Sequence, residues 1–306
     1  MLQDDTPDVL IIGAGPAGLT AATYLGRFLR QVLVADGGEP RAGWIPVSHN
    51  MPGFPKGLSG ASMLERMREQ AREYGAVIEA GRVESLRMDG SGFVAVLNGR
   101  EVRASSVLLA TGVVDRTPDI AGVDEAVRRS LVRICPICDG YEAQGQRVAV
   151  IGDDDAGAHE AAFLRTYSDD VTLLHIGASD QLTERAALAR LGIALVETAL
   201  DDIVIEDDRV KSLSWGGKAT AFDLVYSALG TTPSNTLALS LGAVVGDDGR
   251  LVVDDHCQTT VLGLYAAGDV VKGLNQIAVA TSDAAIATTA IHNGLREREG
   301  RTIGSR

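Results

Sequence analysis

Two segments in which a strand, a glycine turn and a helix follow one another constrain the fold more than any other feature. The first, DVLIIGAGPAGLTAATYLGRFLRQVLVAD, covers residues 8–36 and predicts a strand over 9–12, a helix and a second strand ending at Asp36. The second begins at Arg147 with RVAVIG, continues through AHEAAFLRTY and ends in VTLLHI. Two such βαβ starts predict an α/β protein with two nucleotide-type folds.

The segments between these units repeat as well. FVAVLNGREVRA predicts a hairpin around Asn98-Gly99, and VLLATG follows it as a buried strand. IVIEDDRVKSLSW predicts a hairpin around Asp207-Asp208, and FDLVYSALG follows in the same way. The strand-like run 251–270 and a helix over 282–298 resemble the completion of the first module. We therefore expect one domain from residues 1–114 and 246–306, interrupted by an inserted domain over 115–245.

Composition excludes several classes of protein. The chain has 306 residues, of which 45% are hydrophobic and 23% charged, so it can bury a substantial core. Its net charge of −13 argues against binding to nucleic acid or to an anionic membrane surface. The acidic opening MLQDDTPD and the glycines that follow it argue against a secretory signal or a membrane anchor. These features predict a cytoplasmic protein.

The turn GAGPAG carries the first functional signal. Gly13 permits the tight turn, Gly15 lets the backbone approach a pyrophosphate, and Gly18 allows the helix to pack closely. Asp36 lies 23 positions after Gly13, near the spacing at which a carboxylate meets ribose hydroxyls. Together with the strand and the helix, these residues predict a dinucleotide site.

The segment ICPICDGYE carries the second signal. Cys135 and Cys138 could form a small-loop disulfide, and the neighbouring Arg133 could lower the pKa of a thiol. The alternative is half of a zinc site, but the other possible ligands show no second paired spacing, so we expect no metal. Asp139 could cap a helix or carry the proton that thiol–disulfide exchange requires. The possible ligands outside the pair are Cys257, which we expect to be buried, and His49, His159, His175, His256 and His292.

Four motifs in order carry a resemblance to a known family. GAGPAG, ATG at 110–112, CPICDG at 135–140 and AAGDV at 266–270 resemble the low-molecular-weight thioredoxin reductases, and the resemblance covers nearly the whole chain. It implies an α/β architecture of two Rossmann-like three-layer domains, in which an FAD domain is split by an inserted NADPH-type domain that carries the redox C-x-x-C. It also implies a homodimer.

The resemblance assigns roles to individual residues. Cys138 would face the flavin, Cys135 would exchange with an external disulfide or dithiol, and Asp139 would serve as acid–base. Gln276 and Ile277 match the segment that closes over the isoalloxazine, although the family's usual arginine is here Asn275. The implied ADP-binding residues are Gly13, Gly15, Pro16, Ala17, Gly18 and Asp36, and those near the flavin or ribityl are Asn50, Thr111, Gly112, Gly268 and Asp269.

The second glycine turn departs from the family pattern. It reads GDDDAGAHEA, and the arginines that would hold the 2′-phosphate of NADPH are replaced by Ile176 and Gly177. A carboxylate about 5 Å from a phosphate charge repels it by roughly 3 kcal/mol at an effective dielectric near 20. The sequence therefore argues against NADPH. In the alternative interpretation the aspartates point outward, one caps the helix, and the cradle stays free.

The leading hypothesis is an FAD-dependent disulfide/dithiol oxidoreductase that works without NADPH. Its partner would be a thioredoxin-like protein or a small dithiol, with ferredoxin as electron donor or O2 as acceptor. Arg128, Arg129 and Arg133 are either a docking patch for ferredoxin or a solvated face. The alternatives are an NADPH-dependent thioredoxin-disulfide reductase and a flavin redox sensor without turnover.

Overall fold

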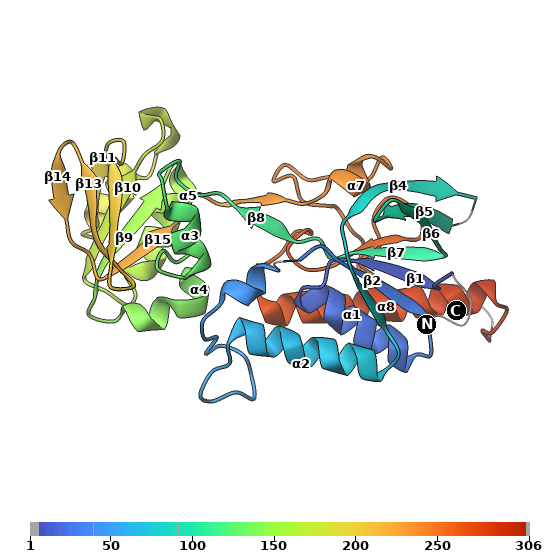
Figure 1. Cartoon of the computed structure of the whole chain (residues 1–306). Coiled ribbons are helices and arrows are strands. Elements are labelled where there is room, and N and C mark those ends of the chain that lie inside the picture. Colours follow the sequence, from blue (N-terminus) through green and yellow to red (C-terminus); the bar gives the residue numbers. More distant parts are fainter. Residues whose placement is uncertain (1–5, 39, 91, 304–306) are drawn as a thin grey trace. The chain divides into compact units, whose positions relative to one another are not determined.

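The computed structural model describes residues 6–38, 40–90 and 92–303, and it divides into two compact units (Figure 1). Unit 1 takes the chain up to Gly43, Leu58–Val114 and the chain from Pro233 onward. Unit 2 takes Trp44–Gly57 and Asp115–Thr232. Two of the connecting segments pair with each other as the strands β8 (Val113–Asp115) and β16 (Thr231–Pro233).

Unit 1 is built on a five-stranded parallel sheet of order β17-β7-β1-β2-β3. Three helices cover one face of it, and the antiparallel sheet β4-β5-β6 packs on the other through a shared apolar core (Figure 1). The strands are β1 (Val9–Ile12), β2 (Val32–Asp36), β3 (Val77–Ala80), β4 (Val83–Asp89), β5 (Gly92–Leu97), β6 (Arg100–Ala104), β7 (Ser106–Leu109) and β17 (Leu264–Ala266). The helices are α1 (Pro16–Arg27), α2 (Gly60–Glu73) and α8 (Ile277–Arg298), with a short α7 (Thr236–Leu239) and a 3-10 turn at Arg41–Trp44.

Unit 2 has a four-stranded parallel sheet of order β11-β10-β9-β15 and a three-stranded antiparallel sheet of order β12-β13-β14. Its strands are β9 (Arg147–Gly152), β10 (Asp170–His175), β11 (Ala194–Glu197), β12 (Asp202–Glu206), β13 (Arg209–Trp215), β14 (Lys218–Thr220) and β15 (Leu224–Ser227). Its helices are α3 (Val123–Arg128), α4 (Pro136–Asp139), α5 (Asp155–Leu164) and α6 (Arg185–Arg190), with 3-10 turns at Gly140–Ala143 and Ser179–Gln181.

The two units repeat one topology. The order β7-β1-β2-β3 in unit 1 matches β15-β9-β10-β11 in unit 2, and in both units an antiparallel three-stranded sheet precedes the strand that returns beside the first. This confirms the prediction of an α/β protein with two Rossmann-like modules.

Both predicted hairpins are present. Asn98 and Gly99 have φ values of 51° and 74°, and Asp207 and Asp208 have 49° and 57°. A two-residue hairpin turn with left-handed backbone at both positions matches the right-handed twist of its strands, which explains why these dipeptides predicted the hairpins.

The C-terminal region differs from the prediction in two places. The strand-like run 251–270 contains only β17, because the Asp254 carboxylate accepts the backbone N–H groups of His256 and Gln258 and closes a turn there. The last helix begins at Ile277 rather than at 282.

The boundaries of the units also differ from those expected. Residues 233–245 group with unit 1, where Ala238 and Ala243 join the core that contains Leu10. Residues 44–57 group with unit 2, where Trp44 packs against the cluster that contains Val127, and its carbonyl oxygen accepts from Ser130. No helix among the described residues is both long and apolar enough to cross a bilayer.

Candidate functional site

In unit 1, most of the predicted FAD-binding residues lie at one edge of the parallel sheet. The glycine turn follows β1, Asp36 ends β2, Thr111 and Gly112 follow β7, and Gly268 and Asp269 follow β17. Parallel strands place their carboxyl ends at the same edge, and ligands of open α/β sheets bind there where the strand order reverses. That reversal occurs at β1, which pairs with β2 on one side and with β7 on the other.

The glycine turn leaves room at the start of α1. Gly13 has φ 113°, and a Cβ there would overlap the carbonyl oxygen of Ala110. A Cβ on Gly18 would overlap the carbonyl oxygen of Gly13, so this turn and helix pack backbone to backbone. A Cβ on Gly15, by contrast, would meet nothing within 4 Å.

Gly15 is also the N-cap of α1, and no side chain caps the helix. The start of α1 thus lacks a side-chain cap and has open space beside Gly15, features that suit the binding of a pyrophosphate at a helix N-terminus. Pro16 begins the helix, where its missing N–H is no loss, and the Cβ of Ala17 lies beside Gly268.

The Asp36 carboxylate is held in place at the end of β2. One oxygen accepts from the backbone N–H of Gly38 at 3.0 Å, and the other is 3.3 Å from the guanidinium of Arg68 on α2. A fixed carboxylate at this point suits the ribose hydroxyls of a dinucleotide.

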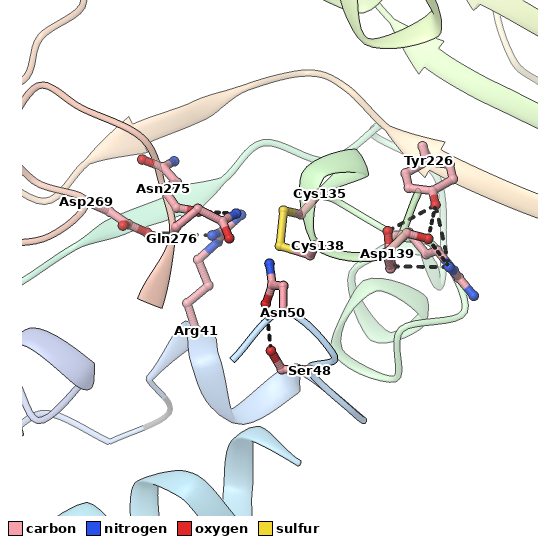
Figure 2. Close-up of a disulfide and its surroundings, with 11 residues drawn as sticks. Arg41, Ser48, Asn50, Cys135, Cys138, Asp139, Tyr226, Asp269, Asn275 and Gln276 are labelled. Carbon is pink, nitrogen blue, oxygen red and sulfur yellow. Dashed lines mark hydrogen bonds and ion pairs between the residues drawn. A yellow bond between two sulfur atoms is a disulfide. The ribbon is translucent and has the colours of Figure 1, made fainter. Parts of the chain in front are cut away.

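The residues after β17 are tied to three groups that the sequence analysis did not single out. Arg41 pairs with Asp269 at 3.6 Å, and Arg250 donates to the side chain of Asn275 at 3.0 Å. Asp283 on α8 accepts from the backbone N–H of Gly268 at 3.2 Å. Figure 2 shows Arg41 directed toward Asp269 and Gln276. In the sequence, the signal that could have pointed to Arg41 and Arg250 is that both are basic residues close to acidic ones.

The other predicted positions in this region have local roles. Thr111 donates its hydroxyl to the carbonyl oxygen of Ser234 at 2.6 Å, and Gly112 has φ 63°. Gln276 is the N-cap of α8 and Ile277 its first residue. Asn50, expected near the flavin, groups with unit 2, and its side-chain oxygen accepts from Ser48 at 2.9 Å.

In unit 2, Cys135 and Cys138 form a disulfide (Figure 2). Cys135 precedes α4, Cys138 lies within it, and Asp139 ends it. The Tyr226 hydroxyl donates to one Asp139 carboxyl oxygen at 3.0 Å, and Arg133 is 3.3 Å from the other.

Burial is the largest influence on the Asp139 carboxyl group, and it raises its pKa to about 6. The Arg133 charge and the Tyr226 hydrogen bond both act in the opposite direction. Tyr226 is fully buried, and its own pKa is raised by burial and by the Asp139 charge. The sequence analysis missed Tyr226, although a tyrosine in the buried-looking strand of LVYSALG was a signal that its hydroxyl has a hydrogen-bond partner.

The acidic turn of unit 2 has the backbone of a dinucleotide fold, but its carboxylates are used inside the unit. A Cβ on Gly157 would lie 2.8 Å from the Cα of Gly152, so strand and helix pack closely here too. Asp154 caps α5 by accepting from the N–H of Ala156 at 2.8 Å, and Asp153 pairs with Arg116.

Asp155 fixes the same turn to the segment before α6. It accepts from the backbone N–H and the hydroxyl of Thr183 at 2.7 and 2.6 Å, and these bonds lower its pKa. The capping arrangement weighed from the sequence therefore describes Asp154, whose carboxylate accepts the N–H of Ala156.

The segment after β10 has no free arginine in the place where a 2′-phosphate would bind. His175 is buried, and its Nε2 lies 3.0 Å from the carbonyl oxygen of Ala178. Arg185, the next basic residue in the sequence, pairs with Glu197 and donates to backbone carbonyls of Ser179 and Leu182.

Cys257 is buried, as expected, and its sulfur lies 3.6 Å from the carbonyl oxygen of Asp283. Within the described ranges, no group of three or more His, Cys, Asp or Glu residues is arranged to hold a metal ion.

Comparisons of the sequence and of the structure with known proteins all point to the same family. A family model described as pyridine nucleotide-disulphide oxidoreductase matches residues 7–284. The thioredoxin reductase of Peptoclostridium acidaminophilum is 32% identical over 309 residues, covering 94% of this chain and 96% of that protein. The crystal structure of HlmI has a TM-score of 0.90 at 29% identity and covers 98% of this chain and 96% of its own. The thioredoxin reductase structure from Streptococcus pyogenes has a TM-score of 0.88 at 27% identity, covering 96% and 100%.

Proposed function

The chain belongs to the pyridine nucleotide-disulphide oxidoreductase family, and from that premise we propose that it exchanges electrons with a disulfide or dithiol substrate without NADPH. It is an FAD-dependent disulfide oxidoreductase similar to thioredoxin reductases. We make proposals on three matters, namely the nicotinamide site, which differs from that of the relatives, the electron partner and the roles of individual residues.

One contrast carries the proposal. The helix α1 begins at Gly15 with no side-chain cap, whereas α5 begins at Asp154, whose own carboxylate accepts the N–H of Ala156. A phosphate binds a helix N-terminus through free N–H groups and a favourable dipole. Asp153, Asp154 and Asp155 place three carboxylates at the second of these N-termini, so α1 suits a dinucleotide and α5 opposes one.

The residues of unit 1 fit FAD. Gly13, Gly15, Pro16, Ala17 and Gly18 would hold the pyrophosphate, and Asp36 would hold the ribose. Arg41, by pairing with Asp269, would orient the residues after β17. Bound FAD would supply two-electron chemistry to the cysteine pair. The remaining residues proposed at the flavin or ribityl are Asn50, Thr111, Gly112, Gly268, Asp269, Gln276 and Ile277.

At the disulfide, we infer exchange in two steps. A substrate thiolate attacks Sγ of Cys135, the Cys135–Cys138 bond breaks, and Cys138 leaves as a thiolate. The second thiolate of the substrate then attacks the substrate sulfur of the mixed disulfide and releases Cys135. Two electrons and two protons pass from the substrate to the pair, and Asp139 carries one of the protons. The same steps in reverse would reduce a disulfide partner.

The electron partner is proposed from charge. Of the three arginines considered as a ferredoxin patch, Arg129 pairs with Asp208 and Arg133 pairs with Asp139. These carboxylates neutralise much of the patch, which favours oxidation of a small dithiol with O2 as acceptor over reduction by an acidic ferredoxin. A thioredoxin-like protein stays the alternative substrate. A cytoplasmic location and a homodimer remain predictions from the sequence.

The test is an anaerobic titration of the yellow holoprotein with NADPH, NADH and then dithiothreitol, following the flavin absorbance. We expect dithiothreitol alone to bleach the flavin and O2 to restore the colour. The Cys138→Ser variant should keep its FAD but lose the bleaching by dithiothreitol. Rapid bleaching by NADPH would overturn the proposal and indicate an NADPH-dependent thioredoxin-disulfide reductase. No bleaching by dithiothreitol in the unsubstituted protein would indicate a redox sensor without turnover.

A further inference from the structure

Asp139 is held by side chains from two separate segments of unit 2. Tyr226 on β15 donates to Oδ1 of Asp139 at 3.0 Å, and Arg133, in the segment before α4, is 3.3 Å from Oδ2. Arg133 also donates to the backbone carbonyl of Asp139 at 3.1 Å, and the Tyr226 hydroxyl lies 3.2 Å from the same carbonyl oxygen. Figure 2 shows the Asp139 side chain turned toward Tyr226.

The backbone fixes the two partners beside each other. The N–H of Arg133 donates to the carbonyl of Val225 at 2.8 Å, and the N–H of Ser227 donates to the carbonyl of Arg133 at 2.7 Å. These two bonds bracket Tyr226 and form a parallel bridge between Arg133 and Tyr226. The two groups that bind the Asp139 carboxylate are thus placed by strand pairing rather than by mobile side chains alone.

The two residues of this ion pair, Arg133 and Asp139, lie on either side of the two cysteines in the sequence. Arg133 lies two residues before Cys135, and Asp139 follows Cys138 directly. The contact between Arg133 and Asp139 therefore closes the segment that contains both cysteines. It does not depend on the S–S bond, so it can keep the carboxyl group in place when the pair is reduced.

We propose that Arg133 and Tyr226 are positioning residues that hold the carboxyl group of Asp139, the residue that follows Cys138, and set the pH at which it exchanges its proton. The inference rests on the proposed function, in which Asp139 carries a proton of thiol–disulfide exchange. When the disulfide takes up two electrons, the S–S bond breaks into two thiolates. Asp139 in its protonated form gives its proton to one of them and becomes the carboxylate that Arg133 and Tyr226 stabilise.

The direction of the effect follows from the contacts. A positive charge and a hydroxyl donor both favour the carboxylate, whereas burial and the nearby charge of Glu142 favour the protonated acid. Burial is the larger influence, so Arg133 and Tyr226 keep the pKa of Asp139 from rising further. Removing either contact should move the protonation of Asp139 to higher pH.

The experiment uses the oxidised holoprotein and the variants Tyr226→Phe, Arg133→Gln and Arg133→Lys. The rate of disulfide opening by dithiothreitol is measured across pH by alkylating the cysteines and quantifying them by mass spectrometry, a readout that does not depend on the flavin. Asp139→Asn defines the part of the pH profile that belongs to Asp139. Lys211→Gln removes a positive charge that pairs with Asp207 on the surface of unit 2, and it serves as the charge control.

We expect Tyr226→Phe and Arg133→Gln each to raise the midpoint of the Asp139-dependent part by about one pH unit. Arg133→Lys should restore most of the original midpoint, and Lys211→Gln should leave it unchanged. Infrared spectra of the Asp139 carboxyl group in the folded protein, with Asp139→Asn as reference, should show the same shift in the pH midpoint of its protonation.

The two possible failures are distinguishable. If Asp139→Asn leaves the whole pH profile unchanged, Asp139 carries no proton in the exchange and that part of the proposed function is wrong. If Asp139→Asn alters the profile while Tyr226→Phe and Arg133→Gln leave its midpoint in place, the positioning role is wrong and the proposed function stands.

Discussion

Gly15 and Gly18 lie three residues apart in one motif, but a side chain would have different surroundings at the two positions. A side chain at Gly18 would overlap the carbonyl oxygen of Gly13 and push strand and helix apart. A side chain at Gly15 would enter space that the protein leaves open. At this scale Gly18 serves the packing of the fold, whereas Gly15 is the position at which we propose that the ligand approaches the backbone.

The two positions give a matched pair of variants. Gly15→Ala should fold with its normal thermal stability in the absence of FAD, because the backbone at φ −80° accepts any residue, but it should retain little FAD. Gly18→Ala should lose about 1–3 kcal/mol of folding free energy, as overpacked sites do. Circular dichroism on heating and the ratio of flavin to protein absorbance check both. A yellow Gly15→Ala protein would contradict the assignment of the pyrophosphate site.

Asp139 makes stability depend on pH. Its pKa is about 6 in the folded protein, above the ordinary 3.8, so the folded state binds more protons than the unfolded state between these values. Its contribution is therefore favourable at low pH and is lost as the pH rises through 4 to 6. The free energy of unfolding of Asp139→Asn, taken relative to that of the wild type, should therefore be about 2 kcal/mol higher at pH 7 than at pH 4. Urea unfolding at the two pH values, followed by tryptophan fluorescence, measures this, and a gain that is the same at both would contradict it.

At the scale of elements, α1 and α5 occupy equivalent places in the two modules but end differently at their N-termini. No side chain caps α1, whereas the side chain of Asp154 caps α5. The carboxylate that we propose to oppose phosphate binding thus also stabilises the helix.

This dual role predicts different effects for two substitutions at one position. Asp154→Ala should destabilise unit 2 by about 1 kcal/mol, whereas Asp154→Asn, which can still cap, should change its stability little. Both tryptophans, Trp44 and Trp215, lie in unit 2, so fluorescence during urea unfolding reports this unit. Equal loss in the two variants would show that the charge and not the cap matters.

The sequence predicted elements well where local chemistry determines them. The dipeptides Asn98-Gly99 and Asp207-Asp208 predicted their hairpins because φ above zero is required there. The sequence alone could not predict that Tyr226 lies beside Asp139, because the two are 87 positions apart and are brought together only by the pairing of two strand segments. Likewise, nothing local indicated that Trp44 packs in unit 2.

At the scale of the molecule, the chain passes between the two units four times, after Gly43, Gly57, Val114 and Thr232. Unit 2 is complete at Thr232. Unit 1 still lacks β17, which pairs with β7, and α8, which packs on α1.

A chain that ends at Val245 tests this difference. It should keep the tryptophan fluorescence of folded unit 2 and a protease-resistant segment over 115–232, while residues 6–43 should be cleaved rapidly. The full chain is the control, in which both units should resist the protease. Resistance of residues 6–43 in the shortened chain would show that the last strand and helix are not needed to fold unit 1.

The discontinuity of unit 1 also affects when this unit can fold during synthesis. During synthesis the apolar strand β7 leaves the ribosome early, and one of its edges stays unpaired until β17 has been translated. Exposed strand edges of this kind are where nascent chains aggregate. We therefore expect this edge of β7 to be the part of unit 1 most exposed to aggregation while the chain is being made.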